Sequence, residues 1–518
     1  MKLHPIGIMM AIAALVGAGT PARAATDPLR FPKDKFKLET VVVKSASGER
    51  RVVYRLYEHL PYVARPVDKD YQSLDVKVPV AIDGRPVDAS MSPILFVIGV
   101  GGYMSAPNVR EGKAVMGPPP GGPPANAGVG PPGGLAGPSG MPPRPGGPPG
   151  GPTGAAETAG LAAGWVIVIP GVRGRDNQGK DGVYFGKAPA AIVDLKAAVR
   201  YIRHNRGVLP GNDEWIVSTG CSAGGALSTL LAASGNSTLY EPYLRQIGAA
   251  AAADNIFAAG CHSPVTDLEH ADQIYEFEFG ASKTTGSQAV DAKVSAELQA
   301  LYRDYQASLR LEGREGFGTL TADNIGAYAV RYYLAPAAGQ FLLGLGEEQR
   351  TDYLAKNPWL KWDGQHASFT LAEFAAQHIK RFKLAPAFDD FGLKAPETNL
   401  FGNASTDSAH FTNYSLRHTS GNAGASVDVQ LQQVVNLMNP MYFLRQRNPG
   451  AAQHWWIRHG AIETDASAIG SINLTTALEN MGRKVNAAIY WDAGHCEDLD
   501  PQGFIDWVGR ITGYRLAH

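Results

Sequence analysis

The chain has 518 residues, of which 44% are hydrophobic and 18% charged, and its formal net charge is −1. This composition is that of an ordinary globular protein, and the balanced charge gives no reason to expect a nucleic acid or a membrane surface as a partner. The length suits one large α/β domain with a big insertion, or two domains. Neither property indicates an oligomeric state.

The first 24 residues have the pattern of a secretory signal peptide. Lys2 and His4 precede an apolar run over residues 6–16, and Ala22-Arg23-Ala24 has the small-x-small form of a signal-peptidase site. We therefore predict that residues 1–24 are cleaved and that the mature protein is secreted or periplasmic. No later stretch is long and apolar enough to predict a transmembrane helix.

Residues 25–116 read as N-terminal strands followed by a buried central strand. The continuous apolar run from Pro93 to Ile98 is typical of a strand that is covered on both faces. A glycine cluster, Gly99 to Tyr103, follows it directly. Residues 117–154 differ from the rest of the chain in composition. They hold 14 Pro and 14 Gly and only one charged residue, Arg144. We interpret them as a disordered or polyproline-like loop inserted between two core strands.

The interpretation of residues 155–263 depends on the stretch around Ser222. An apolar run from Trp215 leads into Gly220-Cys221-Ser222-Ala223-Gly224, and a helical pattern follows that ends at Gly235. Strand, tight turn and helix around Gly-x-Ser-x-Gly is the context of a nucleophile elbow. The alternative interpretation is an ordinary serine in a glycine-rich turn. With the preceding strand and helix, the pattern predicts an α/β-hydrolase fold, a doubly wound and mostly parallel sheet.

If the turn at Ser222 is a nucleophile elbow, the upstream glycine cluster is expected to have a catalytic function. Backbone N–H groups from Gly101 or Gly102, together with that of Ala223, are predicted to form an oxyanion hole, because glycine lets bare backbone approach the developing charge. The alternative is a plain glycine-rich turn.

Residues 264–441 read as helices and irregular loops, which we interpret as a lid inserted into the core. Residues 442–518 return to strands and helices and complete the core. His495 lies in the loop after the last predicted strand, where this fold places the general base, and Glu463 and Asp465 lie in the loop after the strand before it. Spacing does not decide which carboxylate orients His495, and a solvated surface acid remains the alternative for each.

Cysteines flank both predicted catalytic residues. Cys221 precedes Ser222 and Cys496 follows His495, so the two cysteines are close if the catalytic residues assemble. We predict a disulfide between them, which an exported protein can keep; the alternative is two buried free thiols. Cysteine and histidine show no metal-ligand spacing, so we expect no metal site.

At these residues the chain resembles the tannase/feruloyl esterase group of α/β-hydrolases, and most closely its bacterial tannase-like branch. The resemblance implies that Lys383, Glu397 and Asp465 hold the hydroxyl groups of a galloyl ring. It also places the triad acid at Glu463, where bacterial tannases usually carry Asp, so Asp465 stays open as the acid. The adjacent cysteines resemble those of fungal tannases and feruloyl esterases. The matching stretches cover both core and lid: residues 218–226, 264–272, 382–389, 397–402 and 457–467.

The predicted function is that of a secreted serine esterase that needs no cofactor and acts on esters of phenolic acids, with gallate first and hydroxycinnamates second. A feruloyl esterase or a general aromatic carboxylesterase is the alternative within the enzyme class. From another class, the chain could be an inactive hydrolase fold that binds a partner through its Pro/Gly-rich segment.

Overall fold

The computed structural model describes residues 27–45, 48–108, 151–280 and 282–516. The predicted signal peptide, residues 1–24, lies outside the described residues. So does most of the Pro/Gly-rich segment, residues 117–150. No helix in the described ranges has both the length and the apolar character needed to cross a membrane.

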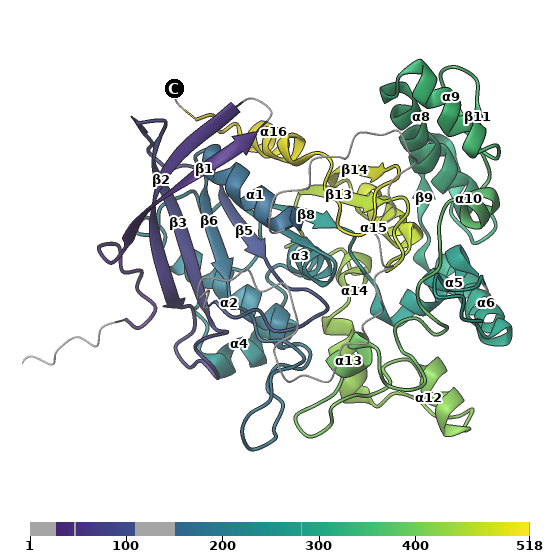
Figure 1. Cartoon of the computed structure of the whole chain (residues 1–518). Helices are drawn as coiled ribbons and strands as arrows, with labels where there is room; N and C mark the ends of the chain where they lie inside the picture. Colours follow the sequence, from purple (N-terminus) through teal and green to yellow (C-terminus); the bar gives the residue numbers. More distant parts are fainter. Residues whose placement is uncertain (1–26, 46–47, 109–150, 281, 517–518) are drawn as a thin grey trace, which may run out of the picture.

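One mixed β-sheet forms the core (Figure 1). Its strand order is β1-β2-β3-β6-β5-β7-β8-β13-β14, with the short β4 paired to β3. The strands from β1 to β6 pair antiparallel, and those from β6 to β14 pair parallel. The strands are β1 (Lys37–Ser45), β2 (Gly48–Pro61), β3 (Ser73–Ile82), β4 (Arg85–Pro86), β5 (Ile94–Ile98), β6 (Val166–Pro170), β7 (Ile216–Cys221), β8 (Ala258–His262), β13 (His454–Gly460) and β14 (Lys484–Tyr490).

Helices cover both faces of the sheet, so the central strands are apolar throughout. All five residues of β5 and of β6 are buried, as expected of parallel strands with two covered faces. Side chains of α1 and α16 belong to the apolar cluster on one face, and those of α2 and α3 to the cluster on the other. The core helices are α1 (Gly151–Ala162), α2 (Ala190–His204), α3 (Ala223–Ala233), α4 (Glu241–Ile247), α15 (Ala468–Asn480) and α16 (Pro501–Thr512).

Helix α1 corrects one sequence boundary. The Pro/Gly-rich segment was predicted to continue to residue 154, but α1 begins at Gly151. Proline is tolerated in the first turn of a helix, because the backbone N–H that it lacks would have no intrahelical acceptor there. The strongly helix-forming alanines from Ala155 onward then extend the helix.

The region between β8 and β13 is mainly helical and lies to the right of the sheet and below it in Figure 1. Two short hairpins, β9–β10 and β11–β12, were not predicted, since two-residue strands carry no periodic signal. Helix α14 (Pro440–Arg445) crosses the predicted boundary between the lid and the core, which was placed at residue 441. The elements are α5 (Ala271–Phe279), α6 (Ala292–Leu309), β9 (Glu312–Gly313), β10 (Gly318–Thr319), α7 (Ile325–Ala329), α8 (Ala335–Gly344), α9 (Glu347–Lys356), β11 (Lys361–Trp362), β12 (Ala367–Ser368), α10 (Leu371–Gln377), α11 (Pro396–Leu400), α12 (Asn413–Ser420), α13 (Val429–Leu437) and α14 (Pro440–Arg445). We refer to residues 264–441 as the lid region.

Candidate active site

Ser222 stands at a strained turn between β7 and α3. Its backbone has φ 56° and ψ −125°, a conformation that a non-glycine residue adopts only where its surroundings impose it. Its N–H donates to the carbonyl of His262, 3.0 Å away on the neighbouring strand. The glycines on either side leave no room for a side chain: a Cβ on Gly224 would lie 2.8 Å from the carbonyl oxygen of Ile98, and one on Gly220 would collide with Gly224. The sequence therefore builds a sharp elbow with the serine at its apex.

His495 and Glu463 meet at the carboxyl ends of β13 and β14. Nδ1 of His495 lies 2.6 Å from Oε1 of Glu463, and the Glu463 side chain is almost fully buried. Burial lowers the pKa of His495, but the hydrogen bond and the charge of Glu463 outweigh it and hold that pKa above its ordinary value. A histidine whose Nδ1 is bonded to a buried carboxylate keeps Nε2 free to exchange a proton.

Glu463 has a second histidine beside it. Nε2 of His459 lies 3.5 Å from Oε2 of Glu463, and Nδ1 of His459 lies 3.1 Å from the hydroxyl of Ser471. Burial acts to raise the pKa of Glu463, but His459 and His495 lower it by a larger amount. The pKa of Glu463 is therefore below its ordinary value. The carboxylate is thus kept ionised. Of the two acids that the sequence left open, Glu463 makes the hydrogen bond with His495; Asp465 acts on His495 through its charge alone.

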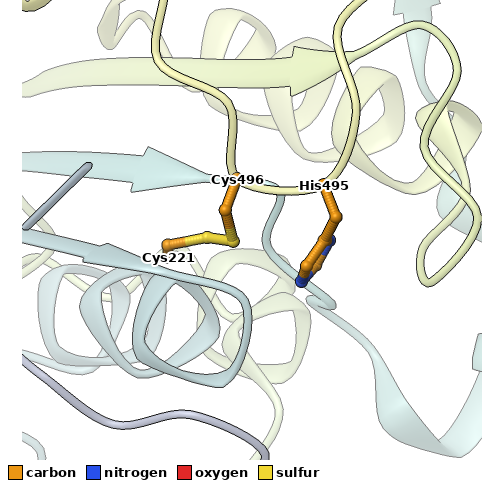
Figure 2. Close-up of side chains that lie close together, drawn as sticks. All are labelled: Cys221, His495 and Cys496. Carbon is orange, nitrogen blue, oxygen red and sulfur yellow. A yellow bond between two sulfur atoms is a disulfide. The ribbon is translucent and has the colours of Figure 1, made fainter. Parts of the chain in front are cut away.

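The predicted disulfide between Cys221 and Cys496 is confirmed. It joins the end of β7 to the loop after β14, across 275 residues of sequence, with a Cα–Cα distance of 5.8 Å (Figure 2). Cys221 is next to Ser222 and Cys496 is next to His495, so the bond ties the loop of the histidine to the elbow of the serine. Figure 2 shows the His495 ring beside the disulfide. Cys261 is a buried free thiol.

Two charged groups, Lys383 of the lid region and Asp465 of the acid loop, act on both His495 and Glu397. Each of them shifts the pKa of His495 and that of Glu397, so both charges lie within electrostatic reach of these two residues. Glu397 lies in α11 and is 7% exposed. Burial raises its pKa, and Lys383 opposes that rise. Its Oε2 is buried and has no hydrogen-bond partner in the part of the chain that the structure describes. Nζ of Lys383 lies 3.9 Å from the ring centroid of Phe388.

Solved structures resemble this chain over nearly its whole length. Tannin acyl hydrolase from Lactobacillus plantarum, in its native structure, matches with a TM-score of 0.76 and 30% identity, covering 93% of this chain and 99% of that one. Tannase from Fusobacterium nucleatum matches with a TM-score of 0.73 and 30% identity over the same shares of the two chains. A tannin acyl hydrolase in complex with ethyl gallate matches with a TM-score of 0.75 and 31% identity, again over 93% and 99% of the chains.

This chain belongs to the bacterial tannase-like branch of the tannase/feruloyl esterase group. The predicted α/β-hydrolase fold is confirmed with it, and its class is carboxylic ester hydrolase. The BD-FAE family model matches residues 183–299, which include the elbow. Esterase LipQ of Mycobacterium tuberculosis is 35% identical over 88 residues, a match that covers only 17% of this chain and 20% of LipQ.

In this tannase-like hydrolase, Arg175 is a site residue that the sequence did not single out. It lies in the loop after β6, and its Nε donates to the carbonyl of Gly102, 2.7 Å away. Its Nη1 donates to Oδ1 of Asn399 in α11 at 3.0 Å, and its backbone N–H donates to Tyr103 at 2.9 Å. The arginine charge also lowers the pKa of Glu397. One guanidinium therefore joins the glycine cluster to the helix that carries Glu397.

The glycine cluster itself is a tight turn. Gly102 has φ 53° and Tyr103 has φ 57°, so two consecutive residues adopt the left-handed conformation. The carbonyl of Gly101 accepts a hydrogen bond from Met104, and Asp176 accepts one from the N–H of Ser105. Ala223 is the first residue of α3, where backbone N–H groups have no intrahelical acceptor.

A buried ion pair and a buried hydrogen bond between a carboxyl group and the backbone hold the segment of the lid region that carries Lys383. Arg381 is fully buried; its Nη1 donates to Glu276 at 2.7 Å and its Nε to the carbonyl of Lys383 at 2.6 Å. Asp272 accepts a hydrogen bond from the backbone N–H of Phe388 at 2.7 Å. Burial raises the pKa of Asp272 to about 7. No pattern in the sequence indicated these buried contacts, because charged residues are found mostly on surfaces.

Proposed function

We propose that this protein is a secreted serine esterase that cleaves esters of phenolic acids, and galloyl esters in particular. The observation that carries the proposal is that Lys383 and Asp465 lie within electrostatic reach of both Glu397 and His495, while one buried oxygen of Glu397 has no hydrogen-bond partner among the described residues. A buried acceptor without a donor is costly, and a phenolic O–H of the substrate would supply that donor.

The recognition step follows from the charges of these three groups. The carboxylates of Glu397 and Asp465 accept hydrogen bonds from vicinal phenolic O–H groups, and the ammonium of Lys383 donates to a phenolic oxygen. A ring without hydroxyl groups offers none of these partners. The proposed site therefore selects for the acyl part of the ester and leaves the alcohol part open.

The proposed reaction proceeds through an acyl-enzyme. Ser222 Oγ attacks the ester carbonyl while Nε2 of His495 takes its proton, and Glu463 holds the imidazole in the right tautomer and stabilises the imidazolium. The proton then passes to the departing alcohol. A water molecule, deprotonated by His495 in its turn, attacks the acyl-enzyme and releases the phenolic acid.

The oxyanion of each tetrahedral intermediate would be held by backbone N–H groups. Ala223 supplies one at the start of α3, and Gly101 or Gly102 supplies the other from the turn that Arg175 holds. Donors fixed in place before the reaction stabilise developing charge without reorganisation, and each is worth about 3 kcal/mol of the barrier.

Export is the part of the proposal that rests on the sequence of residues 1–24. The disulfide between Cys221 and Cys496 supports it, because such bonds persist in oxidising compartments. Sequencing the N-terminus of protein recovered outside the cytoplasm tests it. A mature N-terminus near Ala25 is expected, and an uncleaved chain would contradict the prediction.

The test of the activity is release of free acid from methyl gallate and methyl ferulate by wild type and by Ser222→Ala. Turnover of methyl gallate that the variant loses by about five orders of magnitude would support a serine esterase acting on galloyl esters. Turnover of methyl ferulate alone would make the protein a feruloyl esterase and remove the roles given to Lys383 and Glu397. A Ser222→Ala variant with undiminished activity would contradict the proposed nucleophile.

A further inference from the structure

Three metal-ligating atoms are gathered at the junction of the elbow and the histidine loop. The sulfur atoms of Cys221 and Cys496 and a ring nitrogen of His495 all lie within 4.8 Å of one another. Figure 2 shows the group: Cys221 ends its strand, and His495 and Cys496 are consecutive in the loop that faces it. In the oxidised protein the two sulfurs are bonded to each other. Metals bind to cysteine as the thiolate and not as the disulfide, so the oxidised pair offers no ligand.

We propose that reduction of this disulfide creates a binding site for zinc or another soft divalent cation, made by Cys221, Cys496 and His495. An external dithiol reduces the bond: it gives two protons and two electrons to the cysteine sulfurs and becomes a cyclic disulfide. The cation then displaces the two thiol protons, forms two metal–sulfur bonds, and takes the lone pair of His495 as its third ligand.

The geometry suits a zinc ion. With zinc–sulfur bonds of about 2.3 Å, the ligand atoms of a tetrahedral site lie about 3.8 Å apart. The Cα–Cα distance of 5.8 Å between the cysteines lets the reduced sulfurs separate to that distance by side-chain rotation alone. Two cysteines and one histidine leave a fourth position for water, as in catalytic zinc sites. His495 is 28% exposed, which gives an ion a path from solvent.

Glu463 already supplies the outer part of such a site. It is bonded to Nδ1 of His495, so the free lone pair of the neutral imidazole is on Nε2. A carboxylate on the second nitrogen of a ligating histidine fixes the ring and strengthens it as a ligand. Cys261 is not part of this group of close ligand atoms, and burial raises the pKa of its thiol to about 12.

Metal binding would consume the lone pair that receives the proton of Ser222. The reduced enzyme would therefore be inhibited by zinc, whereas the oxidised enzyme would resist it. Only this consequence for activity rests on the function proposed above. The binding of the metal can be measured without any ester.

The experiment is a titration with Co²⁺, whose thiolate complexes absorb in the near ultraviolet and whose tetrahedral sites absorb in the visible. Wild type is reduced with dithiothreitol, freed of reductant by gel filtration under argon, and compared with untreated enzyme. We expect one Co²⁺ per reduced chain, with both sets of bands, and none in the oxidised chain. Zinc should displace the cobalt and abolish the bands.

Variants separate this site from other sulfur chemistry. Cys261→Ser should bind cobalt as wild type does, and Cys221→Ser/Cys496→Ser should give no thiolate bands after reduction. If the double variant does not fold, oxidised wild type serves as the metal-free control. Glu463→Gln should weaken cobalt binding to the reduced chain about 10–100-fold, the usual cost of losing such an outer partner.

Two results would overturn the proposal. One is a reduced wild type that shows no thiolate bands with excess Co²⁺. The other is a reduced Cys221→Ser/Cys496→Ser variant that gives the same bands as wild type. Neither result bears on ester hydrolysis by the oxidised enzyme, so the proposal and the proposed activity fail independently.

Discussion

The elbow side and the lid side of the candidate site are held in place by different forces. On the elbow side, backbone packing sets the geometry: Ser222 is fixed by a strained turn between glycines, and a disulfide ties the His495 loop to it. On the lid side, buried charges do so. Arg381 pairs with Glu276 and also holds the carbonyl of Lys383.

This difference suggests that the elbow side aligns the reacting atoms and that the lid side selects the acyl ring. Close-packed backbone admits almost no alternative positions, which suits atoms that must stay aligned for the reaction. Buried ion pairs are costly to desolvate and gain their stability only in one arrangement, which suits groups that select a polar ring. Changes on the elbow side should therefore affect every ester alike, and changes on the lid side should depend on the hydroxyl groups of the acyl ring.

The sharpest test of the elbow side is Glu463→Gln. The amide cannot hold His495 in the same tautomer, so kcat should fall about 10⁴-fold on methyl gallate and on methyl benzoate alike. Initial rates on both esters measure it. Asp465→Asn is the matched control, and it should keep most of its activity on methyl benzoate. A large loss in Asp465→Asn with little change in Glu463→Gln would reverse the assignment of the acid.

The lid side is tested by Lys383→Ala and Glu397→Gln. Each removes a hydrogen bond between a charged group and a ring hydroxyl, worth about 1.5–3 kcal/mol, so kcat/KM on methyl gallate should fall about 10–100-fold. On methyl benzoate it should change little. Lys380→Ala, an exposed neighbour, is the control for Lys383. Equal losses on the two esters would show that these residues do not recognise the hydroxyl groups of the ring.

Arg175 joins the two sides and should give an intermediate result. Arg175→Lys keeps the charge but cannot reach both Gly102 and Asn399, and we expect about a tenfold loss of kcat on methyl gallate. Asn399→Ala cuts only the contact with α11 and should cost less. Steady-state kinetics that separate kcat from KM measure both. An Arg175→Lys variant changed only in KM would argue against a role in holding the oxyanion turn.

The smallest expected effect is a shift in pH dependence. The pKa of His495 is held above its ordinary value of about 6.5, and the base must be neutral to accept a proton. Activity should therefore be low at acid pH and rise through a midpoint above 6.5. In Glu463→Gln, which lacks the carboxylate that raises this pKa, the midpoint of the residual activity should move to lower pH. A midpoint that stays in place in the variant would mean that another group titrates.

The sequence by itself determined the elbow, the histidine loop and the succession of core strands and helices along the chain. These features depend on neighbouring residues: a buried strand, two glycines and a helix in succession allow only a sharp turn at Ser222, and a strand that ends before His495 places it at the sheet edge. The disulfide could be predicted for the same reason, because each cysteine is next to a residue whose place the pattern already specified.

Only the tertiary structure decided which acid bonds to His495 and how the lid side is held. Glu463 and Asp465 are two residues apart in one loop, so the path of the backbone, which no periodicity encodes, selects between them. Arg175 matters because folding brings Gly102 and Asn399, almost 300 residues apart, to the same guanidinium. Such contacts come from the packing of distant segments, and a local pattern holds no information about them.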